Sequence, residues 1–119
     1  MQGAITVDPQ GRFLRFQFGP GATIRDWVEA REICLRLSEQ TGIRRALVDV
    51  RRQQVAGPVI ELFEFAHQVP PGMVFAVLSD PHSNDHKFVE TVALNRGKNV
   101  RLFFAAEEEA IEWLTTEAA

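Results

Sequence analysis

The spacing of apolar residues changes several times along the chain, and each change marks a predicted element. Ile5–Val7 and Phe13–Phe18 are short β-rich segments that flank residues 8–11, Asp-Pro-Gln-Gly. Proline presets φ in such a turn and glycine accepts a positive φ, so the two segments predict a β-hairpin. Alternation in the second segment assigns one face to the core (Leu14, Phe16 and Phe18) and turns the other outward (Phe13, Arg15 and Gln17).

A long helix is predicted after the breaker sequence Gly-Pro-Gly at 19–21. Thr23 can cap its start, and Asp26 complements the free N–H groups of the first turn. Apolar residues then recur at helical spacing until Thr41 and Gly42, where glycine supplies the stop. The residues expected to pack on a sheet are Ile24, Trp27, Val28, Ala30, Cys34, Leu35 and Leu37.

Three units of strand and helix follow. Ala46–Val50 is an apolar run without clean alternation, which is typical of a parallel strand buried on both faces. Gly57-Pro58 opens a helix that carries Val59, Ile60, Leu62, Phe63 and Ala66 and ends before Pro70. The next units pair strand Met73–Leu78 with helix Ser83–Arg96, and strand Asn99–Phe104 with helix Glu107–Thr116.

This order predicts an α/β fold with an N-terminal β-hairpin and three further strands in a mixed, largely parallel sheet, on which four helices pack. We expect residues 1–119 to form a single domain, since the length suits one core. The longest apolar run, Met73–Leu78, is far shorter than the roughly 18 to 20 residues that span a bilayer. No secretion signal is recognised near Met1, so we expect a cytoplasmic protein without membrane insertion.

Charge and cysteine content narrow the classes of partner. Thirteen basic and sixteen acidic residues leave a net charge of −3, which disfavours nucleic acid as a partner. The basic residues concentrate at Arg44, Arg45, Arg51 and Arg52, where solvated strand ends are the simplest interpretation. Cys34 is the single cysteine, so no internal disulfide forms, and we expect a buried thiol on a helix face.

The complete order of elements resembles the STAS domains, the fold of the anti-sigma-factor antagonists, and in particular small stand-alone bacterial members. Three stretches carry the likeness: 23–26 entering the first helix, 46–50 in the middle, and 101–104 leading to 109–114, Glu-Ala-Ile-Glu-Trp-Leu. The resemblance implies a regulatory domain that binds a protein partner. Antagonists that are switched by phosphorylation carry a serine after the strand matching 46–50, but Ala56 and Gly57 have no hydroxyl. That switch is therefore not expected here.

Binding in an open parallel sheet usually occurs beyond the carboxyl ends of its strands, and two predicted loops lie there. One loop, 51–57, offers a helix N-terminus and two arginines to an anion or an acidic protein surface. The other loop, 79–86, holds the richest group of polar residues in the chain. The partner-binding or anion-binding candidates are Arg51, Arg52, Gln53, Gly57, Asp80, His82, Ser83 and Asn84.

Alternatives to these assignments remain open. A zinc or other divalent metal site is one alternative, with His82, Asp85 and His86 as its candidate ligands. The same three residues are the candidates if the chain is an enzyme. The competing interpretation is that Ser83 caps a helix and that both histidines are exposed. Phe63 and Phe65 lie about 200° apart on a helix, so one of them should be partly exposed. Together with an outward Phe13, such aromatics predict a self-association patch and hence a homodimer.

The sequence favours a non-catalytic regulatory or protein-interaction module of STAS-like type. It contains no G-x-S-x-G, G-x-G-x-x-G or P-loop motif, so neither an enzyme nor a bound cofactor is expected. The alternative is a carrier of a small apolar or anionic ligand, because the CRAL-TRIO lipid-transfer domains are distantly similar in fold. Those domains are larger, and a chain of 119 residues leaves little room for a gated lipid cavity.

Overall fold

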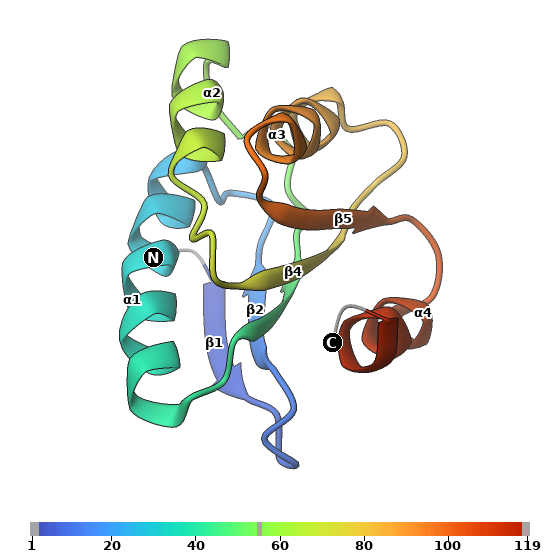
Figure 1. The fold of residues 1–119 in the computed structure, drawn as a ribbon. Coiled ribbons are helices and arrows are strands. Elements are labelled where there is room, and N and C mark those ends of the chain that lie inside the picture. The colour runs from blue at the N-terminus through green and yellow to red at the C-terminus, as the bar shows by residue number, and fades with distance from the viewer. Residues whose placement is uncertain (1–2, 55, 118–119) are drawn as a thin grey trace.

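The computed structural model describes residues 3–54 and 56–117 and places them in an α/β fold around a five-stranded mixed sheet (Figure 1). The strands are β1 (Gly3–Val7), β2 (Leu14–Phe18), β3 (Arg45–Asp49), β4 (Val74–Leu78) and β5 (Asn99–Phe103). The helices are α1 (Ile24–Thr41), α2 (Val59–His67), α3 (Asn84–Asn95) and α4 (Glu107–Glu112), which continues as the π-helical turn η1 (Trp113–Glu117). The predicted fold class is confirmed.

The strands follow one another across the sheet in chain order, β1-β2-β3-β4-β5. β1 pairs antiparallel with β2, and all other neighbours are parallel. Each parallel crossover moves the chain one strand in the same direction, so right-handed connections place α1, α2 and α3 on one face. In Figure 1 these three helices lie on one side of the sheet and α4 on the other.

Each face of the sheet has its own core. The larger cluster lies under α1, α2 and α3, and its strand residues include Leu14, Phe16, Phe18, Ala46 and Val100. The smaller cluster lies under α4 and η1 and consists of Phe13, Leu47, Ala76, Leu78, Phe103, Ala110 and Leu114. The expected inward face of the hairpin strand is confirmed, since Leu14, Phe16 and Phe18 are all buried.

The predicted ends of α1 are confirmed by their hydrogen bonds. The Thr23 side chain accepts from the Arg25 backbone N–H, and the Asp26 carboxylate accepts from the Thr23 N–H at 2.8 Å. Gly42 ends the helix with φ of 76°, a conformation that glycine adopts without a Cβ clash. None of the helices within the described ranges is long and apolar enough to cross a bilayer.

Two expectations about exposure are wrong. Phe13 was expected on the outer side of the hairpin, yet it is fully buried, because α4 and η1 cover that face of the sheet. Val28 and Leu35 were expected to pack on the sheet, yet both are exposed, because they lie beside the stripe of α1 that contacts the core. A helix spacing alone does not show how wide that stripe is.

Candidate functional site

The two predicted loops meet at the carboxyl edge of the sheet. Asp49 and Leu78 are register partners at the ends of β3 and β4, and the Val50 N–H donates to the Leu78 carbonyl at 2.9 Å. The chain therefore leaves β3 and β4 at neighbouring points on the same edge of the sheet. The loop after β3 and the loop after β4 therefore form one surface, as the parallel arrangement predicted.

A buried polar network ties this edge together. The His86 ring lies 2.7 Å from Ser79 Oγ through Nδ1 and 3.0 Å from Gln53 Oε1 through Nε2. Gln53 Nε2 donates to the Ala22 carbonyl at 2.8 Å. These side chains are buried, so the network joins the entry of α1, the loop after β3, the end of β4 and the start of α3.

The hydrogen bonds assign the protonation of His86. Because Gln53 Nε2 faces a carbonyl, its Oε1 faces His86, so His86 Nε2 carries the proton and Nδ1 accepts from the Ser79 hydroxyl. Burial lowers the pKa of His86, while Asp85 and Asp80 act in the opposite direction. A neutral ring with both nitrogens occupied holds the loops in place.

The three metal candidates do not converge. His82 is exposed, and its backbone N–H donates to Asp80 Oδ1 at 2.8 Å. The Asp85 carboxylate accepts from the Ala56 N–H at 3.1 Å, and His86 belongs to the buried network. Among residues 3–54 and 56–117, no group of three or more His, Cys, Asp or Glu side chains is placed to hold a metal ion.

The arginine candidates differ from one another in their surroundings. Arg51 binds Asp49 through Nη2–Oδ2 at 2.8 Å, and although burial opposes ionisation of Asp49, hydrogen bonds from Arg51 lower its pKa. Arg52 is exposed and makes no ion pair within the described part of the chain. Arg44 and Arg45 lie at the start of β3, whereas Arg51 and Arg52 follow its end, so the basic cluster of the sequence is divided between opposite edges of the sheet.

Most other predicted binding residues have structural roles. Gln53 is buried rather than exposed, and the Ser83 hydroxyl caps α3 by accepting from the His86 N–H at 3.3 Å. A Cβ on Gly57 would lie 2.8 Å from Ile24 Cγ2, so glycine is required for close packing there. Asn84 is the exposed first residue of α3.

The exposed face of α2 is the main feature of this edge that the periodicity did not predict. Val59 and Ile60 are 66% and 64% exposed, and Phe63 is 36% exposed. The helix packs inward through Leu62 and Ala66. We call Val59, Ile60 and Phe63 the α2 patch. The prediction that one of Phe63 and Phe65 is partly exposed is confirmed, because Phe63 lies in this patch.

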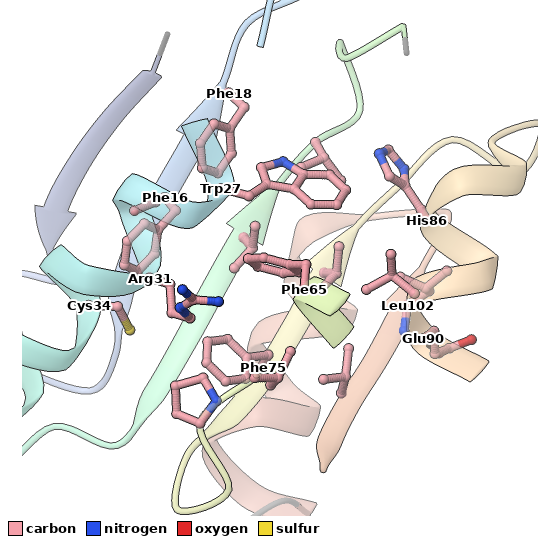
Figure 2. Close-up of a pocket in the computed structure, with 18 residues that line it drawn as sticks. Phe16, Phe18, Trp27, Arg31, Cys34, Phe65, Phe75, His86, Glu90 and Leu102 are labelled. Carbon is pink, nitrogen blue, oxygen red and sulfur yellow. Dashed lines mark hydrogen bonds between the residues drawn. The ribbon is translucent and has the colours of Figure 1, made fainter. Parts of the chain in front are cut away.

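An apolar cavity of about 110 Å³ lies behind α2, between the helices and the sheet (Figure 2). Its wall includes Trp27 and Arg31, of which Trp27 Nε1 and Arg31 Nη1 are buried and have no hydrogen-bond partner within the described ranges. A buried donor without an acceptor costs about 1–3 kcal/mol. Cys34 also lines the cavity, and burial raises the pKa of its thiol to about 11. Sequence spacing predicted that Trp27 and Cys34 face the core but not that a cavity separates them from their neighbours.

Comparisons of the chain with protein-family models, with curated proteins and with solved structures each found no match. The α/β fold is therefore established from the structure itself. The likeness to STAS domains remains a prediction from the sequence.

Proposed function

We propose that this chain is a non-catalytic, cytoplasmic regulatory module of STAS-like type, which binds a partner protein through the α2 patch and the loop before it. The observation that carries the proposal is the exposure of Val59, Ile60 and Phe63 on one short helix. Contiguous apolar side chains on a surface mark interaction sites more often than isolated ones do.

The position of the patch supports a protein as the occupant. Val59 and Ile60 begin α2, directly after the loop that carries exposed Arg52. An exposed apolar surface of this kind suits a partner surface that carries an apolar pocket. Phe63 supplies an aromatic ring, which is a common anchor in such interfaces.

The surroundings of the reactive side chains support a non-catalytic role. Both nitrogens of the buried His86 ring are occupied by Ser79 and Gln53. The raised pKa of Cys34 disfavours the thiolate that would act as a nucleophile. These groups stabilise the fold that presents the patch.

A photo-crosslinking amino acid placed at Ile60 tests this proposal in the cells that naturally contain the protein. We expect a specific crosslinked protein, identified by mass spectrometry, that is absent when the crosslinker replaces Val7. Val7 is a suitable control because it is also an exposed apolar residue but lies on β1, at the opposite edge of the sheet. Ile60→Asp should then weaken binding of the purified partner by at least about tenfold, measured by calorimetry.

The matched variant Val7→Asp should leave the affinity unchanged. Equal binding of the partner by Ile60→Asp and by the unchanged chain would refute the assignment of the surface. A crosslink from Ile60 only to a second copy of this chain would show that the α2 patch is a homodimer interface instead.

A further inference from the structure

The cavity behind α2 interrupts the packing at the centre of the sheet. Val48 lies on β3, and Phe75 and Val77 lie on β4, and both strands have a neighbouring strand on each side. Parallel strands in such a position are ordinarily buried on both faces. All three side chains are nevertheless only partly buried, and all three line the cavity. Their apolar surfaces therefore lack packing partners, and each missing contact forfeits dispersion energy.

The wall of the cavity favours an aromatic ligand. Aromatic rings from β2, α1, α2 and β4 surround the space (Figure 2): Phe16, Phe18, Trp27, Phe65 and Phe75. Aromatic rings attract one another in offset or tilted arrangements, in addition to the effect of burying their surface. The Cys34 thiol also lines the cavity, where it behaves as a small apolar group.

The same wall disfavours a charged ligand, because almost all of it is apolar. The Glu90 carboxylate accepts from a backbone N–H of β5 at 2.7 Å, and both ring nitrogens of His86 are already occupied. The buried donors Trp27 Nε1 and Arg31 Nη1 are closed off from the cavity and do not converge. A charged group placed here would lose its hydration without gaining a hydrogen-bond partner. The ligand must therefore be neutral.

We propose that this cavity binds a neutral aromatic molecule of about one ring, held by apolar contacts alone. Apolar cavities of about 150 Å³ stay free of water and bind benzene. This cavity has a volume of about 110 Å³, so a single ring with at most small substituents is the size that fits. Such a ligand supplies the contacts that Val48, Phe75 and Val77 lack. The site lies on the inner side of α2, away from the α2 patch, so this proposal does not rest on the proposed function and either can fail alone.

NMR titration of the full chain with benzene locates the ligand directly. The methyl signals of Val48 and Val77 should shift saturably and show intermolecular nuclear Overhauser effects to benzene. The methyl signals of Leu114 should do neither, because Leu114 belongs to the core on the opposite face of the sheet. We expect a Kd between the micromolar range and about 1 mM for a ligand with so few atoms.

Two further compounds test the neutral and aromatic character of the ligand. Benzoate carries a carboxylate for which the wall has no partner, so at the same concentration it should leave the signals of Val48 and Val77 in place. Cyclohexane has as many carbon atoms as benzene but no π system, and it should bind about two- to tenfold more weakly.

A larger side chain in the wall tests the location of the site. Ala30 is buried and lines the cavity, so Ala30→Leu should fill part of the space and weaken benzene binding at least about tenfold. Ala105→Leu is the matched control, because it makes the same substitution at an exposed position outside the wall, and it should leave the affinity unchanged. Should the Leu114 signals show that Ala30→Leu does not fold, Val77→Ile adds one methyl group to the same wall and should weaken benzene binding at least about threefold.

The proposal is overturned if benzene causes no saturable shift at Val48 and Val77, which would show that the side chains close the space in solution. It is also overturned if benzoate or cyclohexane binds as tightly as benzene, or if the folded variant at Ala30 or Val77 binds benzene as well as the unchanged chain does.

Discussion

At the scale of single residues, burial decides what His86 does. The sequence placed it in a polar loop beside Asp85, as a candidate residue of a metal site or of an enzyme. In the structure the ring is enclosed between Ser79 and Gln53 and packs beside Trp27 at a ring distance of 5.8 Å. The same imidazole thereby becomes a neutral hydrogen-bonding link between loops.

Stability should depend on pH through this residue. The pKa of His86 is lowered from 6.5 in the folded chain, so its stabilising contribution is present above about pH 6.5 and is lost as pH falls toward the folded pKa. The unfolded chain takes up a proton in that range and the folded chain does not. Urea unfolding measures the free energy of unfolding at about pH 7.5 and about pH 5.5. The decrease in this free energy between the two pH values should be smaller for His86→Gln than for the unchanged chain, and the difference should be at most about 1.4 kcal/mol per pH unit.

The matched variant His82→Gln should keep the full pH dependence, because His82 is exposed. A pH dependence that is identical in the His86 variant and in the unchanged chain would contradict the role of burial at this position.

At the scale of elements, α2 shows how tertiary packing overrides helical spacing. Leu62 and Ala66 alone are buried on this helix, although apolar residues occupy much of its circumference. Phe65 turns toward Trp27, and the α2 patch turns away from the core. The apolar residues of α2 do not by themselves determine which face of the helix is buried. Packing against the neighbouring helices determines it.

This arrangement predicts that substitutions at two apolar positions of α2, only two residues apart, change the free energy of unfolding by different amounts. Leu62→Ala should lower the free energy of unfolding by about 2–5 kcal/mol, because it leaves a cavity in the core. Ile60→Gln should change it by less than about 0.5 kcal/mol, because the side chain is mostly in solvent. Urea denaturation monitored by circular dichroism distinguishes them, and a large loss for Ile60→Gln would mean that the α2 patch is covered in the isolated protein.

At the scale of the whole molecule, the chain order of the strands leaves one face of the sheet to α4 and η1. Leu114 and Ala110 are fully buried against that face, and Arg15 on β2 binds Glu107 at the start of α4 at 2.8 Å. The C-terminal helical segment therefore supplies a complete layer of the fold. The partly exposed ion pair adds little to stability compared with the apolar contacts.

Leu114→Ala should accordingly lower the free energy of unfolding by about 2–5 kcal/mol, even though the residue lies near the end of the chain. Glu112→Ala, at an exposed position of α4, should change it by less than about 0.5 kcal/mol. Thermal and urea unfolding measure both. A Leu114 variant as stable as the unchanged chain would show that the second cluster is not needed for folding.

The sequence predicted best those features that depend on residues close together in the chain. The predicted helix 83–96 is α3 together with its capping residues Ser83 and Arg96, and the predicted strand 46–50 differs from β3 by one residue at each end. The predicted helix 107–116 is observed as α4 and η1. Of the binding candidates, Arg52 and Asn84 are exposed as expected, whereas Gln53 is buried because it hydrogen-bonds to a distant carbonyl at Ala22.

The amino-acid sequence by itself determined the order of elements, the caps of α1 and the α/β class, because these depend on residues within a few positions of one another. Only the tertiary structure decided that Phe13 is buried, that the α2 patch is exposed, and that an apolar cavity lies behind α2. Those outcomes depend on which surfaces meet across the fold, and periodicity along one element contains no information about its neighbours.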